Sequence, residues 1–74
     1  MSKDGEFTDI VRMANQIARQ FAHQPDAAVA AVAAHLDRFW EHEMRADLAR
    51  AIEGGTVTVD PVVVDAVQRL AVTA

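Results

Sequence analysis

Apolar residues near the start of the chain recur at the spacing of an α-helix. Between positions 10 and 21 they are separated by four, three and four residues, which aligns them on one helical face. This face contains Ile10, Ala14, Ile17 and Phe21 and is widened by Met13 and Ala18. Thr8 can cap the first turn through its hydroxyl, and Pro25 acts as a helix breaker after the pattern. We therefore predict a helix over about residues 8–23, preceded by a disordered segment of residues 1–7.

A second helix is predicted over about residues 26–40. Asp26 places a carboxylate at the positive end of the helix dipole, and the many alanines that follow favour helix and allow another helix to approach closely. Its inward face is expected to contain Val29, Val32, Ala33, Leu36, Phe39 and Trp40. We expect this helix to form an antiparallel hairpin with the first one.

A third helix is predicted over about residues 43–53. Met44, Leu48 and Ile52 share one face, and the pair Gly54-Gly55 permits the positive φ that ends many helices. Asp47 and Arg50 are three residues apart, so we expect them to pair on its surface. Nothing in residues 41–43 compels a break, so the second helix is also compatible with continuing through them.

The last part of the chain contains one further helical pattern, after a connector. Residues 56–59 alternate as a strand would, but no second segment offers a partner strand. Asp60-Pro61 combines an N-cap residue with a proline at the first helical position. We predict a helix over about residues 61–72, with Val63, Val67 and Leu70 facing inward. The expected fold is all-α: a small bundle of three to four helices in one domain of residues 1–74.

Size and charge narrow the class of function. A chain of 74 residues without cysteine has a small core and no disulfide to reinforce it, which favours association with a second chain. The net charge of −4 and a pI near 5.1 are unfavourable for nucleic acid. The longest apolar run, residues 27–34, is too short to cross a membrane. The polar, acidic start does not resemble a secretory signal, so we expect a cytoplasmic protein.

No constellation of catalytic residues is recognisable. His23, His35 and His42 lack the spacing of a metal pair on adjacent helical turns. The one serine, Ser2, lies near the end of the chain, and the glycines form no phosphate-binding loop. We therefore expect no catalytic residue, no cofactor and no metal, and no enzymatic activity of the chain by itself.

Four side chains have two readings each. Phe39 and Trp40 point about 100° apart on a helix, so either both belong to a wide core stripe or Trp40, with Arg45, anchors a partner. Asn15 and Gln16 flank the apolar face of the first helix, where their amides are either solvated or hydrogen-bonded to another backbone.

The order of these features resembles a known family. The segments Met13-Ala14-Asn15-Gln16-Ile17-Ala18, His35-Leu36, Arg38-Phe39-Trp40 and Met44-Arg45 are similar to the delta subunit of NAD-dependent, molybdenum- or tungsten-containing formate dehydrogenase. The similarity covers about residues 8–50. Where that family commonly has Asp-Pro-Arg after the Phe-Trp pair, this chain has Glu41-His42-Glu43, so an Asp-Pro helix start and a basic residue are missing.

The resemblance implies a cofactor-free accessory subunit that supports assembly or stability of a cytoplasmic enzyme complex. It implies the catalytic alpha subunit as partner, with the beta and gamma subunits as further candidates, and leaves formate oxidation to those chains. The candidate contact residues are Asn15, Gln16, His35, Arg38, Phe39, Trp40, Met44 and Arg45.

Two other readings remain open on the sequence. The first is a self-associating helical adaptor or antitoxin-like regulator, which would form a homo-oligomer when isolated. The second is a minimal metal-dependent enzyme that uses its histidines.

Overall fold

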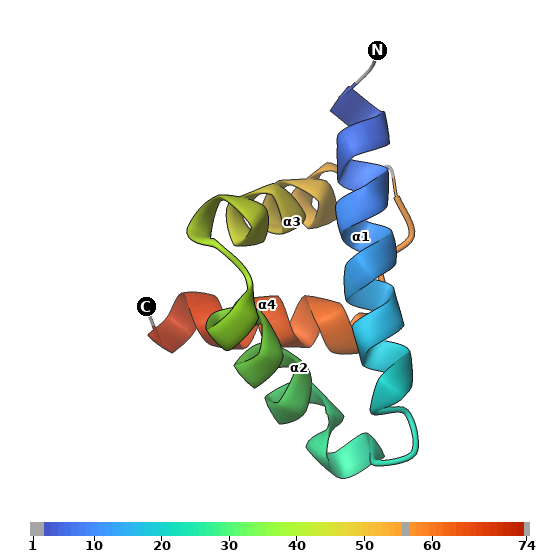
Figure 1. Ribbon diagram of the computed structural model, residues 1–74, viewed down its shortest axis with the longest axis vertical. Helices are drawn as coiled ribbons and strands as arrows, with labels where there is room; N and C mark the ends of the chain where they lie inside the picture. The colour runs from blue at the N-terminus through green and yellow to red at the C-terminus, as the bar shows by residue number, and fades with distance from the viewer. Residues whose placement is uncertain (1–2, 56, 74) are drawn as a thin grey trace.

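Helices joined by short connections make up most of the chain (Figure 1). The computed structural model describes the backbone of residues 3–55 and 57–73, and the side chains of residues 8–55 and 57–71. Within these ranges it contains four helices and no strand: α1 (Lys3–Gln20), α2 (Pro25–Phe39), α3 (His42–Gly54) and α4 (Pro61–Thr73). The all-α prediction is confirmed. No helix in the described ranges combines the length and hydrophobicity needed to cross a bilayer.

The helix ends differ from the expected positions mainly in α1. This helix starts at Lys3, so Thr8 lies within it and does not cap its first turn. It ends at Gln20 and is followed by a turn in which the Phe21 amide bonds the Ala18 carbonyl at 3.1 Å. The expected disorder of residues 1–7 concerns in part residues 1 and 2, which lie outside the described residues. From Lys3 onward the backbone is helical.

The helices are not arranged as a simple hairpin of α1 and α2. α2 does run back from the turn that follows α1, but the two helices diverge from that turn and make only limited contact (Figure 1). α2 packs mainly against α4, and α1 contacts α3 more than it contacts α2. The expected antiparallel hairpin is therefore present only as a reversal of chain direction with limited contact, because the apolar face of α2 is covered by an element more distant in sequence.

The core lies where these helices cross. Its largest fully buried side chains are Val11, Val32, Leu36, Leu48 and Val63, and small residues such as Ala14 and Ala66 fill the space between them. The expected inward residues Leu36 and Trp40 are buried, whereas Phe39 is 68% exposed, against 7% for Trp40. Phe39 therefore does not belong to the core stripe of α2.

Two helix ends are formed as the sequence predicts. Gly55 adopts a left-handed φ of 68°, and its amide bonds the Ala51 carbonyl at 3.2 Å, which closes α3. Asp60 caps α4, because its Oδ1 accepts from the Val62 amide at 2.9 Å. The connector between them is extended and joins no sheet in the described residues.

We expect truncation at the centre of the core to be far more costly than truncation of its exposed neighbour. Leu36→Ala should lower the free energy of unfolding by about 2–5 kcal/mol, because it removes a fully buried side chain. Phe39→Ala, on the same helix, should change it by less than about 1 kcal/mol. Urea unfolding followed by circular dichroism measures both, and equal losses would contradict the burial described here.

Candidate functional site

Asn15 connects α1 to the connector that precedes α4. Its Nδ2 donates to the Thr58 carbonyl at 3.1 Å, and its Oδ1 accepts from the Asp60 amide at 2.8 Å. One side chain thus satisfies two backbone groups more than forty positions away in sequence. Because Asp60 in turn caps α4, Asn15 also fixes where α4 begins. Of the two alternatives that the sequence left open, the amide is thus bonded to another backbone and not only solvated, and that backbone belongs to the same chain.

Arg45 closes the corner between α2 and α3. Its Nη1 lies within hydrogen-bonding distance of the carbonyl oxygens of Leu36 (3.1 Å), Asp37 (3.4 Å) and Trp40. The last carbonyls of a helix have no partner within it and carry partial negative charge, so a guanidinium at this position is favourable. Arg45 is half-buried and Trp40 is buried, so both side chains serve the corner itself.

The corner also shows how this chain forms a helix start without an Asp-Pro pair. α2 ends at Phe39, Trp40 has extended backbone with ψ 140°, and α3 begins at His42. Glu41 occupies the N-cap position without a hydrogen bond from its side chain, while its carbonyl accepts from the Arg45 amide at 3.1 Å. The sequence of residues 41–43 does not by itself require a helix break. The break between α2 and α3 therefore coincides with the Arg45 contacts.

A different group of candidate residues lies on the surface. Phe39 is exposed and its ring lies beside that of His35, with centroids 4.8 Å apart and planes tilted by 47°. Arg38, which precedes Phe39 in the sequence, is also exposed, whereas His35 is half-buried. We call His35, Arg38 and Phe39 the α2 patch. Met44 is partly buried and packs against the core.

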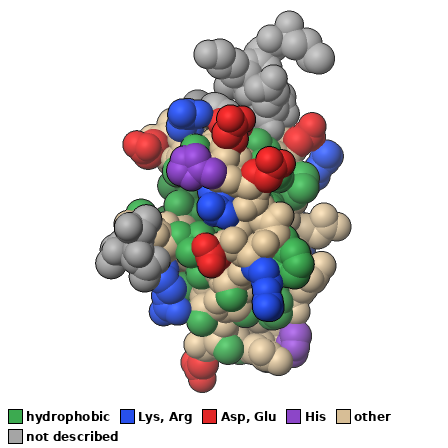
Figure 2. Space-filling model, turned by 60° about the vertical axis from the view of Figure 1, so that its left-hand side comes forward, with side chains coloured by type: hydrophobic (Ala, Val, Ile, Leu, Met, Phe, Trp, Pro, Cys, Tyr) green, Lys and Arg blue, Asp and Glu red, His purple; other side chains and the backbone are tan. Residues whose placement is uncertain are grey.

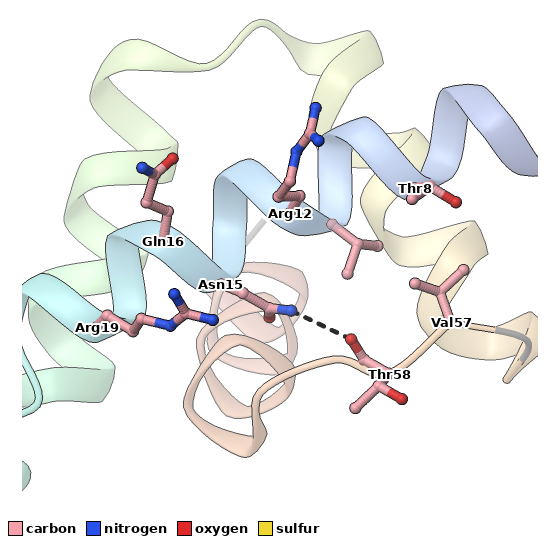
Figure 3. Close-up of a pocket in the computed structure, with 8 residues that line it drawn as sticks. Thr8, Arg12, Asn15, Gln16, Arg19, Val57 and Thr58 are labelled. Carbon is pink, nitrogen blue, oxygen red and sulfur yellow. Dashed lines mark hydrogen bonds between the residues drawn. The ribbon is translucent and has the colours of Figure 1, made fainter.

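A cleft of about 480 Å³ separates α1 from the connector. It is lined by Thr8, Val11, Arg12, Asn15, Gln16, Arg19, Val57 and Thr58. Figure 3 shows Arg19 extending along α1 toward Asn15, on the side of the helix that faces Thr58. We call this space the α1 cleft. Gln16 is among the candidates named from the sequence, but Arg12 and Arg19 are not, although their spacing of seven residues puts these two arginines on one face of the helix.

A second, more apolar cleft of about 360 Å³ lies between α3 and α4. Its lining is Asp37, His42, Arg45, Ala46, Ala49, Val67, Leu70 and Ala71. On the face shown in Figure 2, acidic, basic and hydrophobic side chains are interspersed, and acidic side chains gather toward its upper part. Within the described residues, no three His, Cys, Asp or Glu side chains come together as a metal site would require.

Comparison with protein families supplies the context for this geometry. Residues 9–67 match the model of the family described as "NADH-dependant formate dehydrogenase delta subunit FdsD". The chain belongs to this family. Searches of curated proteins and of solved structures found no match.

The resemblance noted in the sequence is thus confirmed, and the match to the FdsD family extends further than residues 8–50. It includes the connector and the first half of α4. Asn15 and its two backbone partners at Thr58 and Asp60 all lie inside the matched segment. The Asn-Gln segment is therefore joined physically to a part of the chain outside the resemblance that the sequence showed over residues 8–50.

Removal of the Asn15 amide should loosen the connector. We expect Asn15→Ala to lower the free energy of unfolding by about 1–3 kcal/mol, since two hydrogen bonds are lost and the Asp60 amide is left without its partner. Hydrogen exchange of that amide should become faster. The matched control is Gln16→Ala, an exposed position at which we expect little change. Identical behaviour of the two variants would contradict the role given to Asn15.

Removal of the Arg45 guanidinium should weaken the corner. Arg45→Met keeps most of the aliphatic stem but removes the donor to the Asp37 and Trp40 carbonyls, whereas the Leu36 carbonyl keeps the Trp40 amide, so we expect a loss of about 1–3 kcal/mol in the free energy of unfolding. Arg50→Met is the control, because Arg50 forms an exposed ion pair with Asp47 at 2.9 Å, a contact worth less than about 1 kcal/mol. Thermal unfolding distinguishes the two, and a loss at Arg50 as large as that at Arg45 would be inconsistent with the corner described here.

Proposed function

We propose that this chain is a non-catalytic accessory subunit that binds the catalytic subunits of a cytoplasmic formate dehydrogenase and stabilises the assembled complex. The proposal depends on the exposed ring of Phe39, in a chain of the FdsD family. Burial of this ring against another protein would remove apolar surface from water, which is favourable. The catalytic alpha subunit is the proposed partner, with the beta and gamma subunits as further candidates.

The α2 patch has the composition of a protein-binding surface. Burial of an exposed phenylalanine contributes about 1.5–3 kcal/mol, which is the scale of an interface hot spot. Contact with His35 already restricts the conformations of the Phe39 side chain, so less conformational entropy is lost on binding. Arg38, which precedes Phe39 in the sequence, is also exposed, and arginine is enriched at binding surfaces.

The internal contacts of the other candidate residues support an accessory role. Asn15, Trp40 and Arg45 form the connector bonds, the core and the corner of this chain. Their side chains thus maintain the fold that presents a surface. The proposal assigns formate oxidation to the partner subunits. A domain with so small a core gains stability from docking, because any partner that binds only the folded state shifts the folding equilibrium.

Self-association is the rival function, because an exposed Phe39 is equally able to meet a second copy. It predicts a homo-oligomer in light scattering that persists at low protein concentration. The accessory role predicts that the chain binds the other subunits, and that this binding replaces any contact between two copies of the chain.

The deciding experiment is co-purification with the formate dehydrogenase subunits of the same organism. We expect the tagged chain to retain the alpha subunit, and we expect a strain lacking the chain to lose assembled complex and formate-dependent NADH formation. Absence of co-purification together with unchanged activity in the deletion strain would reject the proposal.

Phe39→Ala tests the contact surface itself. We expect it to weaken binding to the complex prepared without this chain by about tenfold to a hundredfold, as loss of a buried phenylalanine requires. The control is Met13→Ala, which truncates the other large apolar side chain found exposed in the described residues, at 43%. Calorimetry measures both affinities, and a Phe39→Ala chain that binds like the wild type would contradict a contact at the α2 patch.

A further inference from the structure

The α1 cleft is positively charged in a chain that is acidic overall. Its lining contains two arginines and no Asp or Glu, whereas the chain has a net charge of −4. Along a helix, seven residues correspond to about 10 Å, so Arg12 and Arg19 supply positive charge toward the two ends of the cleft. This local charge opposes the sign of the whole molecule.

The two arginines differ in how they are neutralised. Arg12 donates to Asp9, just outside the cleft, with an Nη2 to Oδ1 distance of 2.7 Å, so part of its charge is already balanced. The guanidinium of Arg19 forms no hydrogen bond or ion pair with any part of the chain that the structure describes. It extends toward Asn15 and Thr58 (Figure 3). Of these two arginines, Arg19 is therefore the one whose guanidinium is available to pair with an anion.

The connector, which forms the wall of the cleft opposite α1, is held in place before any ligand binds. Asn15 holds the backbone at Thr58 and Asp60 by two hydrogen bonds, so the connector keeps its distance from α1. Val57, which is half-buried, adds apolar surface from this wall. A preformed site with apolar surface between polar groups is suited to a ligand that offers both kinds of contact.

We propose that the α1 cleft binds an acidic segment of a partner polypeptide, with Arg19 pairing a carboxylate and Val57 packing against its apolar atoms. The identity of the partner as a formate dehydrogenase subunit rests on the function proposed above. A polypeptide segment is favoured over a small anion, because a single exposed guanidinium holds a small anion weakly. A segment that spans the cleft makes several contacts at once.

The first test uses hexaglutamate as the probe and the whole isotope-labelled chain. We expect amide shift changes in NMR spectra to cluster at residues 8–19 and 57–58, to weaken as salt is added, and to be absent with hexalysine. Arg19→Glu should abolish them. Arg38→Glu is the matched control, because it makes the same change in net charge at another exposed arginine in the last turn of a helix. Absent or scattered shift changes, or changes that persist in Arg19→Glu, would overturn the inference.

The second test uses formate dehydrogenase prepared without this chain. We expect Arg19→Glu to weaken binding at least about tenfold relative to the wild type, and Arg50→Glu, an exposed arginine on α3, to bind normally. Arg19→Gln is the second variant, since it removes the charge without placing an acid at the negative end of α1, and circular dichroism verifies that each variant is folded. Full binding by both Arg19 variants overturns the inference while the accessory function stands. If the wild type does not bind at all, the accessory function fails, and the hexaglutamate experiment still decides whether the cleft takes acidic peptide.

Discussion

The capping of α2 by Arg45 is the interaction on which the rest of the structure most depends. The guanidinium lies against carbonyls at the end of α2, and Arg45 itself belongs to the first turn of α3. The two helices are thereby joined at a fixed corner after a break of two residues. The corner places Trp40 in the core and leaves Phe39 outside, although the two are neighbours in the chain. A continuous helix through this region would not present the same surface.

A second constraint acts from the other end of the chain. The extended connector offers backbone groups that no sheet satisfies in the described residues, and Asn15 provides partners for two of them. Since α4 starts at the connector and covers α2, the position of this one amide influences the largest helix contact in the molecule. The α1 cleft is a consequence of the same contact, because Asn15 holds its two walls together.

These constraints divide the residues of the family resemblance into two groups. Asn15, Trp40 and Arg45 are used within the chain, whereas Phe39, Arg38 and Gln16 face solvent. The division fits a small subunit whose distinctive residues first form a stable shape and then present a limited surface. Internal and surface positions are both needed for such a role, since a partner can recognise only what the fold exposes.

The sequence by itself determined the helical class, the approximate helix positions and several helix ends. Periodicity is a local property, and so are the chemistry of Gly55 and the Asp60-Pro61 start, which is why these expectations were met. Family membership was also readable, because it depends on the order of short segments.

Only the tertiary structure decided which helices pack together, whether Phe39 or Trp40 is buried, and what Asn15 and Arg45 bind. It also brought Arg19 beside a connector far away in sequence. Each of these outcomes depends on contacts between distant segments and on which of several apolar faces is covered. The spacing of residues along a chain does not contain that information.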